Sequence, residues 1–220
     1  MKLFNIKSTV SLLAFSLFCS NLWAQTVTLG QPTYAGPGCP QGSVAATLSP
    51  TSDTLSILYD KFTIATTPGR RTNELRSSCT VKVPVNLPQG YSMNVLKLDY
   101  RGFKLMPMMA QASITTRGLQ MWNRSQMIGN SPKVTNLSGP SNDIFFVSHN
   151  LDRQLNSYCG SSFILEFTTE LRLAGGFANR GGIPVFQGDA QLTLDSADLN
   201  SPDGANQDGA HFQVQLNKCR

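Results

Sequence analysis

Alternation of apolar and polar side chains is the feature that most constrains the fold of this chain. It is clearest between residues 163 and 173, where one set of alternate positions is apolar and the intervening set is mostly polar. Successive side chains of a β-strand point to opposite faces, so this period of two predicts a strand with one buried and one solvated face. The apolar set is Phe163, Leu165, Phe167, Leu171 and Leu173, and the intervening set is Ile164, Glu166, Thr168, Glu170 and Arg172.

The same period recurs along the chain, and no window shows a sustained helical period. Residues 211–217 and 81–87 alternate in this way, and Pro84 indicates an edge strand or a bulge. Turn signals such as Gly139-Pro140 separate the segments. We therefore expect one all-β domain, an antiparallel β-sandwich of about eight to ten strands, with a barrel as the alternative. The other expected strands are residues 27–29, 43–48, 54–65, 93–103, 113–122, 143–148 and 190–194.

Low charge content excludes several classes of protein. Charged residues make up 14% of the 220 residues and apolar residues 40%, whereas soluble domains carry about 25% charged residues. This composition excludes a coiled coil, a charged disordered tail and a multi-span membrane protein. The 18 basic and 13 acidic residues give a net charge of +5 without a basic run longer than Arg70-Arg71, so we expect no nucleic-acid partner.

The first 24 residues have the organisation of a secretory signal peptide. A start with two lysines precedes the mostly apolar residues 10–18, and Ala24 offers a small residue for cleavage. We expect residues 1–24 to be removed and residues 25–220 to form a secreted or periplasmic domain without a membrane span. The segment Asn136-Leu137-Ser138 matches an N-glycosylation sequon, which matters only in a eukaryotic secretory pathway.

Four cysteines remain in the expected mature domain: Cys39, Cys79, Cys159 and Cys219. An even number of cysteines in an exported chain predicts two disulfides, and four cysteines allow three connectivities. Strands that simply alternate up and down bring all four sulfurs to one end of the sandwich, so topology leaves the pairing open. We favour neighbours in sequence, Cys39–Cys79 and Cys159–Cys219. A zinc site is the competing interpretation, but the Cys-x-x-Cys spacing is absent.

A charged stripe between residues 97 and 101 is the candidate ligand-binding site. Lys97, Asp99 and Arg101 fall on one face of an expected strand, and Tyr100 falls on the other. Arginine binds anions through paired N–H groups and aspartate accepts hydrogen bonds from sugar hydroxyls, so the stripe has the chemistry to hold a ligand. The competing interpretation, which we favour at this point, is a cross-strand ion-pair ladder that fixes strand register.

Catalytic patterns are weak. Glu166 and Glu170 share a face, but four residues of strand separate their Cα atoms by about 13 Å, beyond the roughly 5–9.5 Å that glycosidase carboxyl pairs need. A triad would use His149 or His211, but neither a G-x-S-x-G nor an H-E-x-x-H motif is present. We therefore assign no catalytic residue.

Metal binding has one acidic candidate and one thioether candidate. An acidic loop would offer calcium oxygen ligands through Asp198, Asn200, Asp203 and Asp208, but its spacing does not fit an EF-hand. Methionines concentrate between residues 106 and 127, and thioethers bind copper(I), but methionine is also a general filler of apolar gaps. We expect no cofactor, and calcium is the alternative to be tested.

Six short segments form a specific combination across nearly the whole expected mature chain. They are residues 38–44 (GCPQGSV), 76–79 (RSSC), 88–91 (PQGY), 99–103 (DYRGF), 171–173 (LRL) and 213–219 (QVQLNKC). In this combination the chain resembles a family of small secreted four-cysteine proteins of unknown function found in fungi and bacteria. Residues 104–118 and 175–188 depart from the family's pattern. The resemblance implies a secreted domain with four cysteines, and it supplies no catalytic residues.

Two classes of function remain open. The first is an exported, non-catalytic binding or surface-structural module whose partner is a glycan, an envelope polymer or a surface protein. The second is a hydrolase that acts on an extracellular polymer through a site without a recognised motif. We favour the first class, because no residue set combines an acid, a base and a nucleophile in a recognisable pattern, although fold alone does not fix function.

Overall fold

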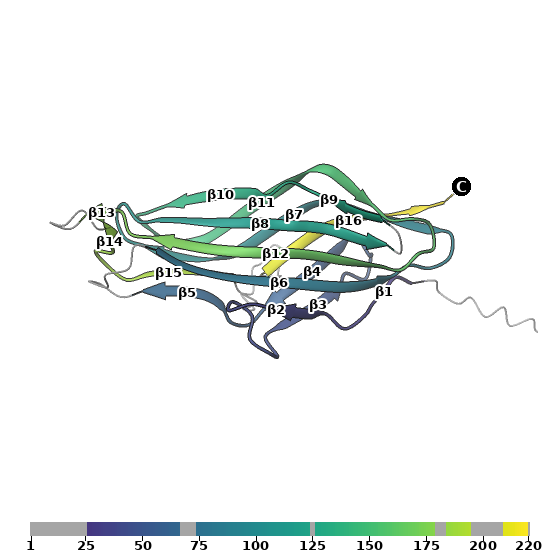
Figure 1. The fold of residues 1–220 in the computed structure, drawn as a ribbon, viewed down its shortest axis with the longest axis horizontal. Helices are drawn as coiled ribbons and strands as arrows, with labels where there is room; N and C mark the ends of the chain where they lie inside the picture. Colours follow the sequence, from purple (N-terminus) through teal and green to yellow (C-terminus); the bar gives the residue numbers. More distant parts are fainter. Residues whose placement is uncertain (1–25, 67–73, 124–125, 179–183, 195–208, 220) are drawn as a thin grey trace, which may run out of the picture.

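The computed structural model describes residues 26–66, 74–123, 126–178, 184–194 and 209–219. These residues form β-strands and no helix (Figure 1). The expected signal peptide lies outside them and stays a prediction. Among the described residues there is no helical segment with the length and apolar character needed to traverse a bilayer.

Sixteen strands make up the described fold, and the five longest carry the surfaces discussed below. These five are β6 (Glu74–Asn86), β7 (Tyr91–Met106), β8 (Gln111–Asn123), β11 (Ser141–Asn156) and β12 (Phe163–Ala174). The others are β1 (Thr28–Leu29), β2 (Thr33–Ala35), β3 (Val44–Leu48), β4 (Thr54–Tyr59), β5 (Phe62–Thr66), β9 (Gln126–Gly129), β10 (Lys133–Ser138), β13 (Phe177–Ala178), β14 (Pro184–Val185), β15 (Ala190–Leu194) and β16 (Gly209–Lys218).

Two antiparallel sheets pack face to face, which confirms the predicted β-sandwich (Figure 1). Sheet A has the strand order β1-β6-β12-β8-β10, with β2 also pairing β6 and β9 also pairing β8. Sheet B has the order β3-β4-β16-β7-β15-β5, with β11 also pairing β7. Strands β16 and β15 pair with successive stretches of β7, and β11 pairs along most of the same strand.

The core lies between the sheets, where the alternating apolar residues of both sheets meet. In β12 the predicted apolar positions are buried, and their polar neighbours lie on the outer face. Phe167 of sheet A meets Phe212 of sheet B edge to face, with ring centroids 4.8 Å apart. Both side chains are fully buried, and burial of each stabilises the fold by about 1.5–3 kcal/mol.

Both expected disulfides are present, and each involves a connection that crosses between the sheets. Cys79 of β6 is bonded to Cys39, which lies between β2 of sheet A and β3 of sheet B. Cys219, just after β16 of sheet B, is bonded to Cys159, which lies between β11 of sheet B and β12 of sheet A. The bonded cysteines are 40 and 60 residues apart, so each closure stabilises the fold by about 4 kcal/mol through the unfolded chain.

Pro84 lies in a strand whose second neighbour is short. Strand β6 pairs with β12 along nearly its whole length, whereas on the other side it pairs only with β1 and β2. The Pro84 carbonyl accepts a hydrogen bond from the Gly30 amide at 2.8 Å, on the β1 side. Because the N–H and C=O of one strand residue point the same way, the missing Pro84 donor faces that side and removes no bond to β12.

The strand count exceeds the expected eight to ten for two reasons. The expected strand 54–65 is two strands, β4 and β5, because the chain bends at Asp60-Lys61. The alternation criterion also misses β2, β9, β10, β13 and β14, which have two to six residues each and therefore show too few alternations.

Candidate functional site

The charged stripe of residues 97–101 lies on the outer face of sheet B. Lys97, Asp99 and Arg101 belong to β7, and their neighbours Leu98 and Tyr100 are fully buried in the core. Lys97 Nζ lies 2.8 Å from Asp99 Oδ2, and Ser148 of β11 donates a hydrogen bond to Asp99 Oδ1 at 2.6 Å. The Asp99 carboxylate is thereby held in one orientation by a cation on its own strand and a hydroxyl on the next.

Two exposed apolar side chains flank this stripe, and sequence reasoning did not identify them. Phe146 lies opposite Arg101 in the β7–β11 register, and Ile144 lies opposite Phe103. Their exposed fractions are 64% for Phe146 and 48% for Ile144. We call this surface the mixed face, and it comprises Lys97, Asp99, Arg101, Ile144, Phe146 and Ser148.

Gly102 decides which of two consecutive phenylalanines reaches the mixed face. A Cβ atom at Gly102 would lie 2.0 Å from the Thr193 carbonyl oxygen and 2.8 Å from the Phe145 ring, so no larger residue fits. Phe145, opposite Gly102, is therefore able to turn into the core, where it is 4% exposed. Side chains alternate along β11, so Phe146 points to solvent.

The outer face of sheet A carries a zigzag of ion pairs, which we call the ladder. It runs Arg172–Glu74–Arg76–Glu170–Arg117 across β12, β6 and β8. Arg117 Nη2 lies 3.0 Å and Arg76 Nη1 3.8 Å from Glu170 Oε1. The Glu74–Arg76 pair lies within β6, and the other three pairs are diagonal neighbours on adjacent strands, the arrangement that favours one strand register over its alternatives.

The carboxylates of Glu166 and Glu170 contact cationic side chains of neighbouring strands in sheet A. Glu170 is held by Arg117 and Arg76 as part of the ladder. Glu166 lies 3.2 Å from Lys82 Nζ and accepts a hydrogen bond from the Trp122 indole N–H at 2.7 Å. Both side chains are occupied by partners within the sheet, and neither lies in the hollow described next.

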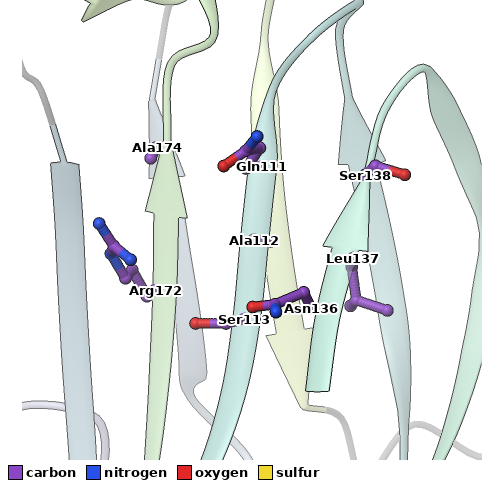
Figure 2. Close-up of a pocket in the computed structure, with 8 residues that line it drawn as sticks. All are labelled: Gln111, Ala112, Ser113, Asn136, Leu137, Ser138, Arg172 and Ala174. Carbon is purple, nitrogen blue, oxygen red and sulfur yellow. The ribbon is translucent and has the colours of Figure 1, made fainter. Parts of the chain in front are cut away.

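A shallow hollow of about 300 Å³ opens on the outer face of sheet A (Figure 2). Arg172 of β12, Ser113 of β8 and Asn136 of β10 lie side by side across three strands and form part of its lining (Figure 2). Gln111, Ser138 and the small Ala174, which occupy the next row of the same three strands, also line it. No sequence signal pointed to this hollow, because it exists only in the register of three strands.

A buried polar cluster joins the two sheets behind both outer faces. The Tyr100 hydroxyl of sheet B hydrogen-bonds the hydroxyls of Thr116 at 2.7 Å and Thr169 at 2.9 Å, both in sheet A. His149 Nδ1 lies 2.7 Å from the Thr116 hydroxyl, and its Nε2 lies 3.0 Å from that of Thr135. Burial raises the pKa of Tyr100 to about 12, and burial, followed by the charge of Lys133, lowers the pKa of His149.

The contacts of His149 in this cluster argue against a catalytic role for that residue. Both ring nitrogens of His149 are engaged by threonine hydroxyls, and the residue is 4% exposed. His211 lies opposite Asp99 in the register of β16 and β7. A triad needs a histidine that reaches a nucleophile and substrate, and the surroundings of His149 are those of a core residue.

Metal-ligand groups do not gather in the described part of the chain. Among those residues there is no group of three His, Cys, Asp or Glu side chains that would hold a metal. The calcium candidates Asp198, Asn200, Asp203 and Asp208 lie outside the described residues. Of the clustered methionines, Met106 and Met121 are buried in the core, whereas Met108 and Met109 are exposed.

Comparison with known proteins confirms the resemblance to a secreted family of unknown function. Residues 25–201 match the family described as "Domain of unknown function (DUF4360)". A protein of Arthroderma benhamiae named "Uncharacterized secreted protein" is 27% identical over 171 residues, which are 76% of this chain and 64% of the relative. The chain thus spans about 64% of the length of that curated relative.

One solved structure aligns along most of the chain. It is the structure of TmCBM61 in complex with beta-1,4-galactotriose, and the alignment covers 85% of this chain and 88% of that one. The sequence identity is 7% and the TM-score is 0.25. At that TM-score the likeness carries no argument about the ligand of this chain.

Proposed function

The chain belongs to the DUF4360 family of domains of unknown function, and we propose that it is an exported, non-catalytic module that binds an extracellular glycan through the mixed face. The observation that carries this proposal is the exposed Phe146 ring beside the oriented carboxylate of Asp99. An aromatic platform next to a few placed polar groups is the usual composition of a small-ligand site.

The two parts of the mixed face suit the two sides of a sugar. The apolar C–H face of a sugar ring packs against an aromatic ring, while its hydroxyls hydrogen-bond charged side chains. Asp99 is already fixed by Lys97 and Ser148, so binding costs little additional side-chain entropy there. Phe146 contributes little to folding while it is 64% exposed, so a bound ring would recover most of its burial energy.

Three observations support export. The first 24 residues have the pattern of a signal peptide, two disulfides are present, and the A. benhamiae relative is named as secreted. Residues 25–220 are then the functional form, in a secreted or periplasmic location. Intact-mass analysis of protein recovered outside the cytoplasm should find a chain that begins at Gln25, and a retained Met1 would contradict export by cleavage.

Binding is favoured over hydrolysis by the roles of the titratable groups. His149 is bonded within the core, and Glu166 and Glu170 are bonded within sheet A. A hydrolase needs such groups near the scissile bond. The mixed face instead combines recognition chemistry with an exposed ring, which suits a module that holds a polymer without cleaving it.

A glycan array with the mature chain tests the proposal. We expect binding to at least one extracellular glycan, and Phe146→Ala should lower the affinity about tenfold or more, because the lost burial is about 1.5–3 kcal/mol. Val134→Ala is the matched control, because Val134 is an apolar side chain of sheet A with a similar exposed fraction, 57%. Absence of glycan binding, or equal losses in the two variants, would contradict the proposal.

A further inference from the structure

The hollow on sheet A is built by two rows of directly paired residues. Arg172 of β12 and Asn136 of β10 both lie opposite Ser113 of β8. In the next outward row, Ala174 and Ser138 both lie opposite Gln111. All six residues line the hollow.

Four neutral polar side chains of the hollow have no side-chain partner among the described residues. Gln111, Ser113, Asn136 and Ser138 offer two amides and two hydroxyls, each of which both donates and accepts hydrogen bonds. Within the part of the chain that the structure describes, these four side chains form no hydrogen bond with another side chain. Backbone pairing alone explains the strands, so the side chains facing the hollow are available to a ligand.

The electrostatics of the hollow favour an anion. The ladder contains three arginines and two glutamates, so it carries one uncompensated positive charge. Arg172 is one end of the ladder and lines the hollow. Its guanidinium has five N–H donors, and one glutamate leaves several of them available.

We propose that this hollow binds a carboxylate-bearing sugar residue, a uronate, at a site separate from the mixed face. The Arg172 guanidinium binds the sugar carboxylate, while the amides of Gln111 and Asn136 and the hydroxyls of Ser113 and Ser138 bind the ring hydroxyls. The hollow lies at the small end of the range for small-molecule sites. Four neutral groups that both donate and accept suit vicinal hydroxyls, which do the same, better than they suit an acidic peptide.

Titration calorimetry with uronate oligomers tests the inference. The probes are oligogalacturonate, oligoglucuronate, methyl-esterified oligogalacturonate and poly-glutamate, added to mature chain produced in a host without N-glycosylation, because Asn136 begins a sequon. We expect at least one uronate to bind, and the corresponding ester and poly-glutamate to bind tenfold more weakly or less. Failure of both uronates, or equal binding of poly-glutamate, would overturn the assignment.

Two arginines of the ladder provide a matched pair of variants. Arg172→Gln should weaken uronate binding at least tenfold, whereas Arg117→Gln, which removes the same charge from the other end of the ladder, should weaken it less than threefold. Ser138→Leu should also abolish binding by filling the hollow without changing its charge. Equal losses in the two arginine variants would show a general charge effect and overturn the site.

The outcome also separates this inference from the proposed function. If Phe146→Ala loses uronate binding and Arg172→Gln retains it, the uronate binds at the mixed face, which overturns the hollow as its site and leaves the proposed function standing. If Arg172→Gln weakens uronate binding while Phe146→Ala has no effect on the glycan array, the hollow is supported as the uronate site and the mixed face is overturned as a glycan site.

Discussion

The outer faces of the two sheets use their charged residues differently. On sheet A, side chains of opposite charge on β6, β12 and β8 pair across strands, and even the Trp122 indole is bonded to Glu166. On sheet B, the ion pair of Lys97 with Asp99 lies within one strand, and Phe146 and Ile144 remain exposed. Cross-strand charge pairs stabilise one strand register. Exposed apolar side chains beside an oriented carboxylate do not contribute to register in this way. The comparison separates the charged residues of sheet A that support strand register from those of sheet B that leave an oriented carboxylate beside an exposed aromatic ring.

The largest expected effect tests whether the two faces share one folding unit. Cys159→Ser/Cys219→Ser should lower the free energy of unfolding by about 4 kcal/mol, because it releases a long loop in the unfolded chain. Urea unfolding is followed by Trp122 fluorescence, which reports on sheet A, and by circular dichroism, which reports on both sheets. Both signals should shift together, and a Trp122 transition separate from the circular dichroism transition would show that the faces unfold independently.

Acid should weaken the support of both faces through His149. This side chain connects β11, which carries Phe146, to β8 and β10, which form the hollow. Burial and Lys133 lower its pKa below the ordinary value of 6.5, so the unfolded chain binds the proton first as the pH falls. The stability from neutral His149 is complete above about pH 6.5 and is lost as the pH falls from there to the folded-state pKa.

Melting temperatures measured between pH 8 and pH 5 check this prediction, with His149→Gln as the comparison because glutamine does not titrate. The variant should lose the decline below pH 6.5 that the natural chain shows. Asp53 and Asp152 also have lowered pKa values, through hydrogen bonds from Ser49 and Lys133. Their protonation changes stability only at pH values below about 4, outside the range of this measurement. An identical decline in the two proteins between pH 7 and pH 5 would assign the acid sensitivity to other groups.

A smaller effect sharpens the contrast between the faces directly. Glu170→Gln removes the carboxylate that Arg76 and Arg117 share, so it should lower stability by about 0.5–1 kcal/mol, and 0.5 M salt should reduce the difference. Asp99→Asn should change stability less, because the amide oxygen still accepts from Ser148, but it should weaken glycan binding. Chemical denaturation and glycan binding of both variants check this, and the reverse pattern would exchange the roles assigned to the faces.

The smallest expected effect concerns calcium. The acidic segment 195–208 lacks the spacing of a calcium loop, so 1 mM calcium should raise the melting temperature by less than about 2 °C. A site with a dissociation constant of about 10 µM would add about 2.7 kcal/mol, or roughly 5–10 °C for a domain of this size. Melts with calcium and with chelator measure the shift, and a rise of several degrees that Asp203→Ala abolishes would establish a site.

Local alternation predicts which way a side chain faces but not which residue lies beside it. It placed Glu166 and Glu170 correctly on the outer side of β12. Their partners Lys82 and Arg117 come from β6 and β8, and that neighbourhood is set by pairing between strands far apart in sequence. The sequence did not predict the hollow either, because the hollow depends on the combined register of β12, β8 and β10.

In the mixed face, the alternation of apolar and polar residues does not predict which apolar side chain is exposed. Lys97, Asp99 and Arg101 were assigned to one face because they are two residues apart in an expected strand. The run Ile144-Phe145-Phe146-Val147 is apolar throughout, so the sequence pattern does not say which phenylalanine faces solvent. That choice depends on Gly102, which lies across the strand pair and leaves room for Phe145 alone.

The bond between Cys159 and Cys219 determines how the domain bears mechanical load at its C-terminus. A force on Arg220 would otherwise peel β16 from β7, breaking the hydrogen bonds of the ladder between the two strands one after another. The disulfide passes that force to the β11–β12 connection instead, so strands in both sheets are pulled along their length and many backbone bonds resist together. Under oxidising conditions a load applied just after Cys219 is therefore shared by both sheets, and a reductant would make the end of β16 the place where unfolding begins.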